Sequence, residues 1–232
     1  MLSSRPTQFV GLSLKLYGQC VATEDKVIAM NWQEFTALLV LATAMSFTPG
    51  PNTTLSTALA ANHGLRRAMP FVCAVPVGWC VLLGLCALGL GSLVLAVPVL
   101  GWAIKGVGVA YLLWLAVKLA RTRQMGPLDA ARLQVTFWQG AALQFVNIKA
   151  WMLALAIVSG WIAGRPDPGQ RMAVVMPVML AFAFFSNLTY ALAGSLLRGW
   201  LAGPAGSGRR LATFNRAMAT VLAATALWML FR

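Results

Sequence analysis

Two short interruptions in otherwise apolar sequence hold the residues that could do chemistry. The first reads Pro49-Gly50-Pro51-Asn52, and the second places Asn147 and Lys149 two residues apart. A helix that begins at Pro51 has first-turn N–H groups without internal partners, and these groups suit an anion such as a carboxylate. Asn52 adds a donor and an acceptor, and Lys149 adds a positive charge. Together these groups favour binding of a small ligand, and no nucleophile lies beside a base as covalent catalysis would need.

The first interruption must break a helix. Each proline removes a backbone donor, and the residue before it is pushed out of the α region. The motif lies in a stretch without formal charge from Phe35 to Asn62. Inside a bilayer, freed backbone groups are tolerated only where protein or a polar cavity satisfies them, and such breaks are typical of transporter binding sites. A kink that serves packing alone is the alternative, although one proline would suffice for it.

Lys149 lies near the middle of the second apolar segment. A lysine at a helix centre costs about 2.5–3.5 kcal/mol on insertion scales, and snorkelling to an interface is the usual remedy. We expect instead that Lys149 and Asn147 face a polar cavity, where the ammonium meets a substrate carboxylate or released carbonyls. Asn187 and Tyr190, three residues apart, could line the same cavity or pack between helices.

The composition is that of a membrane protein. Of 232 residues, 59% are hydrophobic and 10% are charged, against about 25% charged in soluble domains. The formal charge of +13 comes from 18 Lys and Arg against 5 Asp and Glu, and the basic residues gather in short loops. That pattern indicates anionic lipid headgroups as the partner rather than nucleic acid. No cofactor is expected, and a homo-oligomer stays open.

We expect an all-α polytopic protein with one transporter domain over residues 30–232. The predicted spans are 34–61, 69–91, 99–119, 136–162, 172–196 and 211–231, with a tight turn near Val97-Pro98. Loops after the first, third and fifth spans hold nine basic residues and the other two loops hold two. This bias predicts that the odd loops are cytoplasmic and that both termini lie outside.

The two halves are related in pattern. Phe47–Asn52 has a counterpart 98 residues on, in Phe145–Ala150. Each half has three predicted spans, so the second half enters the membrane in the opposite sense. We therefore predict two inverted three-helix repeats with broken helices 1 and 4, an arrangement typical of secondary transporters.

Residues 1–29 differ from the rest, because they are mixed polar and lack an apolar core of signal-peptide quality. Met30 then directly precedes the first span. Our hypothesis is that Met30 is the true start and that 1–29 are a misassigned extension. A disordered or surface-lying segment is the alternative.

The positions of the few acidic residues and of the cysteines limit which classes of substrate the protein could carry. No acidic residue falls securely inside a predicted span, and Glu34 lies at the outer edge of the first. A zwitterion whose carboxylate meets Lys149 is therefore favoured over a fully cationic substrate. Four cysteines show no metal-ligand spacing and are expected to pack as small apolar residues: Cys20, Cys73, Cys80 and Cys86. An ion or metal efflux protein is the alternative function, and a transmembrane thiol redox protein is a weaker one.

Four motifs occur in a fixed order: Pro49-Gly50-Pro51-Asn52, Gly64-Leu65-Arg66-Arg67-Ala68, Gly106 to Leu115 with Tyr111 inside it, and Phe145-Val146-Asn147-Ile148-Lys149-Ala150. Over residues 30–232 the chain resembles the LysE superfamily, and specifically its RhtB (homoserine/threonine resistance) branch. The resemblance implies efflux of amino acids or their derivatives across the bacterial inner membrane, driven by the proton gradient. It adds Tyr111 to the substrate-binding candidates. Ile148 stands where the family carries proline, which predicts a softer break in the fourth span.

Overall fold

The computed structural model describes residues 30–123, 134–203 and 208–231, and within these ranges every element is helical. The elements are α2 (Trp32–Phe47), α3 (Pro51–His63), α4 (Leu65–Ala87), α5 (Leu90–Ala96), α6 (Pro98–Arg121), α8 (Phe137–Val146), α9 (Ile148–Ile157), the π-helical turn η1 (Val158–Ile162), α10 (Pro168–Ala202) and α11 (Arg209–Leu230). The predicted all-α class is confirmed for these residues. The extension 1–29, with Cys20, lies outside the described residues.

The first predicted break is confirmed at the residues that the sequence indicates. Helix α2 starts with a capping box, in which the Asn31 side chain accepts from the Glu34 N–H at 2.7 Å. It ends at Phe47, and Thr48 is extended, with φ −72° and ψ 130°. Pro51 then takes the first position of α3, where its missing N–H costs nothing.

The second predicted break is also confirmed. Helices α8 and α9 meet at Asn147 with a bend of 68°, although Ile148 retains the N–H that a proline would lack. The Asn147 side chain supplies the reason, because its oxygen accepts from the Lys149 N–H at 3.1 Å and caps the new helix. A break softer than a proline break stays a prediction.

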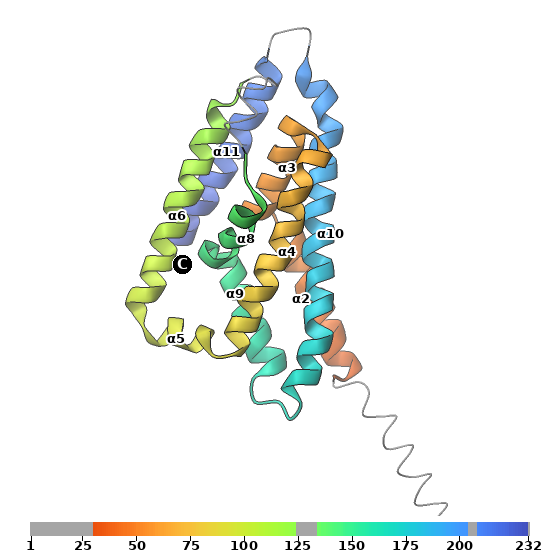
Figure 1. Ribbon diagram of the computed structural model, residues 1–232, viewed down its shortest axis with the longest axis vertical. Coiled ribbons are helices and arrows are strands. Elements are labelled where there is room, and N and C mark those ends of the chain that lie inside the picture. The colour runs from red at the N-terminus through yellow and green to blue at the C-terminus, as the bar shows by residue number, and fades with distance from the viewer. Residues whose placement is uncertain (1–29, 124–133, 204–207, 232) are drawn as a thin grey trace, which may run out of the picture.

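The chain runs back and forth along one long axis (Figure 1). It rises through α2 and α3, returns through α4, rises through α6, returns through α8 and α9, rises through α10 and returns through α11. Helix α3 packs along α10, α6 packs along α11, and α4 packs against α8. The broken segments therefore lie among the longer helices.

Glycines let these helices approach closely. A Cβ atom at Gly194 of α10 would lie 2.2 Å from the Thr57 carbonyl oxygen of α3. At Gly108, in the third motif, it would lie 2.0 Å from the carbonyl oxygen of Val146, the last residue of α8. Small residues at helix crossings are typical of membrane bundles, and Gly108 brings α6 directly against the second break.

Three described helices are long and apolar enough to cross a bilayer, namely α4, α6 and α10. The bent pair of α8 with α9 and η1 makes a fourth candidate. By the same measure α2 and α3 are each too short alone. Helix α11 does not meet the criterion either, and it carries Arg209, Arg210 and Arg216. The six-span inverted repeat thus stays a prediction.

Element boundaries differ most around the predicted second span. Helix α4 begins at Leu65 and ends at Ala87, instead of covering 69–91. Gly89 adopts φ 103°, a left-handed conformation that favours glycine, and the short helix α5 follows. The predicted turn at Val97-Pro98 is confirmed, since Val97 is non-helical and Pro98 begins α6.

Candidate functional site

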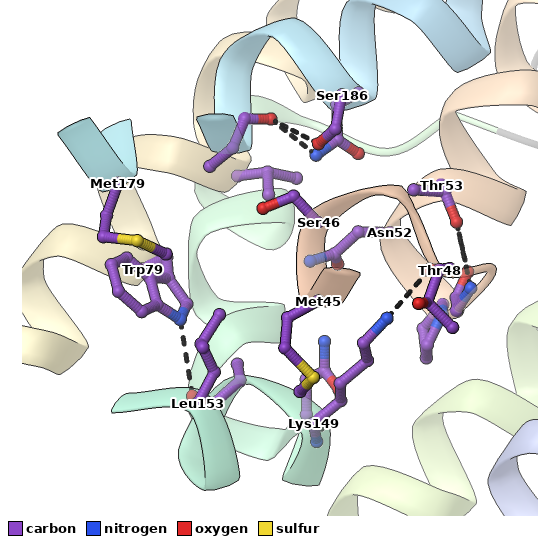
Figure 2. A pocket seen from close by; sticks show the side chains of 17 residues that line it. Met45, Ser46, Thr48, Asn52, Thr53, Trp79, Lys149, Leu153, Met179 and Ser186 are labelled. Carbon is purple, nitrogen blue, oxygen red and sulfur yellow. Dashed lines mark hydrogen bonds between the residues drawn. The ribbon is translucent and has the colours of Figure 1, made fainter. Parts of the chain in front are cut away.

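A cavity of about 60 Å³ lies between the two breaks (Figure 2). Residues from α2, α3, α4, α9 and α10 line it. Five of the predicted site residues are among them: Gly50, Pro51, Asn52, Asn147 and Lys149. Two segments almost a hundred residues apart in sequence therefore meet at one small space.

The ammonium of Lys149 binds the backbone at the first break. Its Nζ donates to the Thr48 carbonyl oxygen at 2.8 Å. That oxygen belongs to the end of α2, where carbonyls lack intrahelical partners and the helix dipole is negative. A Cβ atom at Gly50 would lie 3.4 Å from Lys149 Cδ and 3.5 Å from its Nζ, so the lysine side chain lies directly against this glycine.

Other side chains satisfy the carbonyls that the breaks release. The Tyr190 hydroxyl donates to the Phe47 carbonyl at 2.8 Å, and the Thr48 hydroxyl donates to the Ala44 carbonyl. At the second break the Trp151 indole N–H donates to the Phe145 carbonyl at 2.8 Å. Tyr190, predicted either to line the cavity or to pack, thus binds the end of α2.

Asn52 has a partner that the sequence did not indicate. Its Nδ2 donates to Gln144 Oε1 at 2.9 Å, and Gln144 Nε2 donates back to Asn52 Oδ1 at 3.2 Å. Gln144 is fully buried and also donates to the Gly140 carbonyl at 3.1 Å. The available signal was a glutamine one turn before Asn147 in an apolar run. This amide pair joins the start of α3 to the end of α8.

Asn187 both lines the cavity and connects helices. Its Oδ1 accepts from Ser56 Oγ of α3 at 2.9 Å, and its Nδ2 donates to the Ala183 carbonyl at 2.8 Å. Ser186 lies beside it on the cavity wall. The two interpretations offered for Asn187 from the sequence are therefore both met.

Two predicted site residues lie elsewhere. Tyr111 is in α6, half-buried, with its ring 5.5 Å from the Trp114 ring, and it packs against the larger apolar core. Pro49 is exposed and forms the break itself. Neither is among the residues that line the cavity, so contact of either with substrate stays a prediction.

The cavity is positively charged. Lys149 is the single charged side chain among the described residues that line it. Glu34 is remote from it and forms ion pairs with Arg165 at 3.1 Å and Arg171 at 3.0 Å. A site with an ammonium, a helix N-terminus and amide groups suits a carboxylate, because each of these groups donates to negative charge.

Comparison with known proteins places the chain in a family. The model of the family described as LysE type translocator matches residues 43–231. The chain belongs to the LysE type translocator family. It is therefore a multi-pass membrane transporter and not an enzyme. No solved structure matches the chain.

Similar relatives are named cysteine/O-acetylserine efflux proteins. The relative from Salmonella choleraesuis is 32% identical over 145 residues, which cover 62% of this chain and 74% of the relative. The relative from Escherichia coli O1:K1 is 33% identical over 157 residues, covering 65% of this chain and 75% of the relative. The relative from Klebsiella pneumoniae is 29% identical over 158 residues, which cover 66% of this chain and 78% of the relative.

Proposed function

We propose that this LysE family member exports small amino acids or their derivatives, with cysteine and O-acetylserine as the first candidates, across the bacterial inner membrane. The names of its relatives support the cargo. The contact between Lys149 Nζ and the Thr48 carbonyl supports the mechanism, because it holds a positive charge at the meeting point of two broken helices.

In the proposed mechanism the substrate takes over the partners of that contact. Its carboxylate pairs with Lys149 and with the N–H groups at the start of α3, which lack intrahelical acceptors. The Thr48 carbonyl, once released, accepts from the substrate ammonium. Each polar group of this contact then keeps a partner, so that binding leaves no unpaired charge beside the apolar residues that line the cavity.

The amide pair of Asn52 and Gln144 positions this site. It fixes the first turn of α3 against α8, while Asn147 orients the first turn of α9 and with it Lys149. Movement of one half against the other would shift the two helix starts relative to each other and so expose the site to either side in turn.

We also propose six spans, arranged as two inverted repeats. The alternating direction of the described helices supports this (Figure 1), since α3, α6 and α10 all end toward the same end of the molecule. The basic residues in the sequence after these three helices favour a cytoplasmic location for that end, and we propose that both termini lie outside. Membership of the RhtB branch, coupling to the proton gradient and an inner-membrane location are parts of the same proposal.

The experiment is an efflux assay on Lys149→Ala. Cells that express the full chain are loaded with radiolabelled cysteine or O-acetylserine, and its appearance outside is followed. We expect Lys149→Ala to abolish efflux while an immunoblot finds the same amount of protein in the membrane. Lys105→Ala is the matched control, because Lys105 lies over the Trp102 ring at 4.8 Å, away from the cavity, and should leave efflux unchanged. Full transport by Lys149→Ala would falsify the proposed role.

A further inference from the structure

We infer that the end of the cavity away from the Thr48 carbonyl is a side-chain subsite that admits small uncharged side chains and rejects basic and bulky ones. Four residues form this subsite: Met45, Trp79, Leu153 and Met179. The inference rests on the proposed function, because it assumes that the substrate carboxylate binds Lys149. It goes further by naming the residues that select among amino acids.

Figure 2 shows the two ends of the cavity. Trp79 and Met179 lie together on one side, and Lys149 points away from them toward Thr48. Leu153 and Met45 lie between these two groups. A zwitterion bound through its carboxylate at Lys149 would therefore direct its side chain toward the indole and the thioether.

The wall of the subsite is apolar and fixed on one side. Trp79 is 4% exposed, and its Nε1 donates to the Ala150 carbonyl at 3.3 Å. This bond turns the polar atom of the indole to the backbone and leaves its carbon surface to the cavity. Met179 is 1% exposed and Leu153 8%. The subsite thus offers dispersion contacts and no strong hydrogen-bond donor.

The size of the cavity limits what can enter. A volume of about 60 Å³ holds roughly four to six water molecules, since each needs about 10–15 Å³ of such space. The thioether side chains are unbranched and flexible and can move aside to a limited extent. The hydrogen-bonded indole cannot do so without losing its bond. Short side chains, such as those that end in a thiol or a hydroxyl, are therefore favoured over branched or aromatic ones.

The charge of the site excludes basic side chains. Within the described residues that line the cavity there is no carboxylate to pair with a second ammonium or a guanidinium. Such a group would lie against Trp79 and Met179, where an unpaired charge loses its hydration without compensation. It would also add positive charge next to Lys149. A lysine or arginine substrate therefore fits this site poorly.

The test is counterflow exchange in proteoliposomes that contain the purified full-length protein. Vesicles loaded with unlabelled cysteine are given radiolabelled cysteine, leucine or lysine outside. We expect wild type to exchange cysteine at least about tenfold faster than leucine and to leave lysine at the level of empty vesicles. In Met179→Ala, which enlarges the subsite, the cysteine-to-leucine ratio should fall about tenfold.

Met176→Ala is the matched control. It removes the same side chain from the same helix one turn earlier, at a partly buried residue that packs against the same apolar cluster as Met179 but does not line the cavity, so its ratio should equal that of wild type. Lysine exchange by wild type at the rate of cysteine overturns the inference without need of a variant. An unchanged ratio in Met179→Ala also overturns it, and in both cases amino-acid export stands. If wild type exchanges no amino acid, the proposed function fails and the subsite fails with it.

Discussion

The amide pair of Asn52 and Gln144 gives the most quantitative prediction. Two hydrogen bonds at 2.9 and 3.2 Å join these side chains, and Gln144 has no access to water that could replace them. Interhelical hydrogen bonds in membrane proteins contribute on average about 0.6 kcal/mol each. The pair should therefore show a coupling energy of about 1.2 kcal/mol in a double-mutant cycle.

The assay is reversible unfolding in mixed micelles of wild type, Asn52→Ala, Gln144→Ala and the double variant. Either single variant should lower the free energy of unfolding by about 1–3 kcal/mol, because it leaves a buried amide without its partner. The double variant should cost less than the sum of the two. Additive effects, with a coupling energy within about 0.3 kcal/mol of zero, would refute the claim that this pair joins the two breaks.

Three further predictions concern packing, the first break and orientation. Gly194→Ala should lower the free energy of unfolding by about 1–3 kcal/mol, because its methyl group would lie 2.2 Å from the Thr57 carbonyl oxygen; Gly199→Ala in the same helix meets no atom within 4 Å and should not destabilise. Tyr190→Phe removes the donor to the Phe47 carbonyl and should lower the free energy of unfolding by about 1 kcal/mol in the same assay. An unchanged free energy of unfolding would contradict this prediction. In a background without native cysteines, Ser92→Cys should react with an impermeant maleimide added to intact cells and Arg209→Cys should not; the reverse labelling would contradict the proposed orientation.

The first break could be predicted from the sequence because its cause is covalent. Pro49 and Pro51 cannot donate, and two prolines around one glycine break the helix, whereas the single prolines Pro70, Pro76 and Pro177 stay inside helices. The second break has a different cause. Asn147 interrupts the helix through its side chain, which competes for the Lys149 N–H, while Ile148 is free to be helical. A pattern that depends on proline therefore misses the cause of this break.

The contacts that the site residues make could not be predicted from the sequence, because they depend on tertiary structure. Lys149 was expected to face a polar cavity, and it lines one, but its contact with Thr48 requires the two breaks to meet. Gln144 gives no periodic signal of its own and gains its role only because α8 lies against the start of α3. Tyr111 was included by motif, yet α6 directs it toward Trp114 and the apolar core. A motif determines the local backbone conformation, but it does not determine which residues contact it in the folded protein.

The affinity for cysteine with and without its carboxylate, measured in wild type and in a Lys149 variant, tests the central claim most directly. Purified wild type and Lys149→Met are titrated with cysteine and with cysteine methyl ester, which lacks the carboxylate, and Kd is measured for each. Hydrogen bonds to charged groups contribute about 1.5–3 kcal/mol, so wild type should bind cysteine at least about tenfold more tightly than the ester. Lys149→Met should bind both with similar weak affinity. If Lys149→Met instead keeps the wild-type preference for the free carboxylate, the substrate does not bind at the meeting point of the two broken helices.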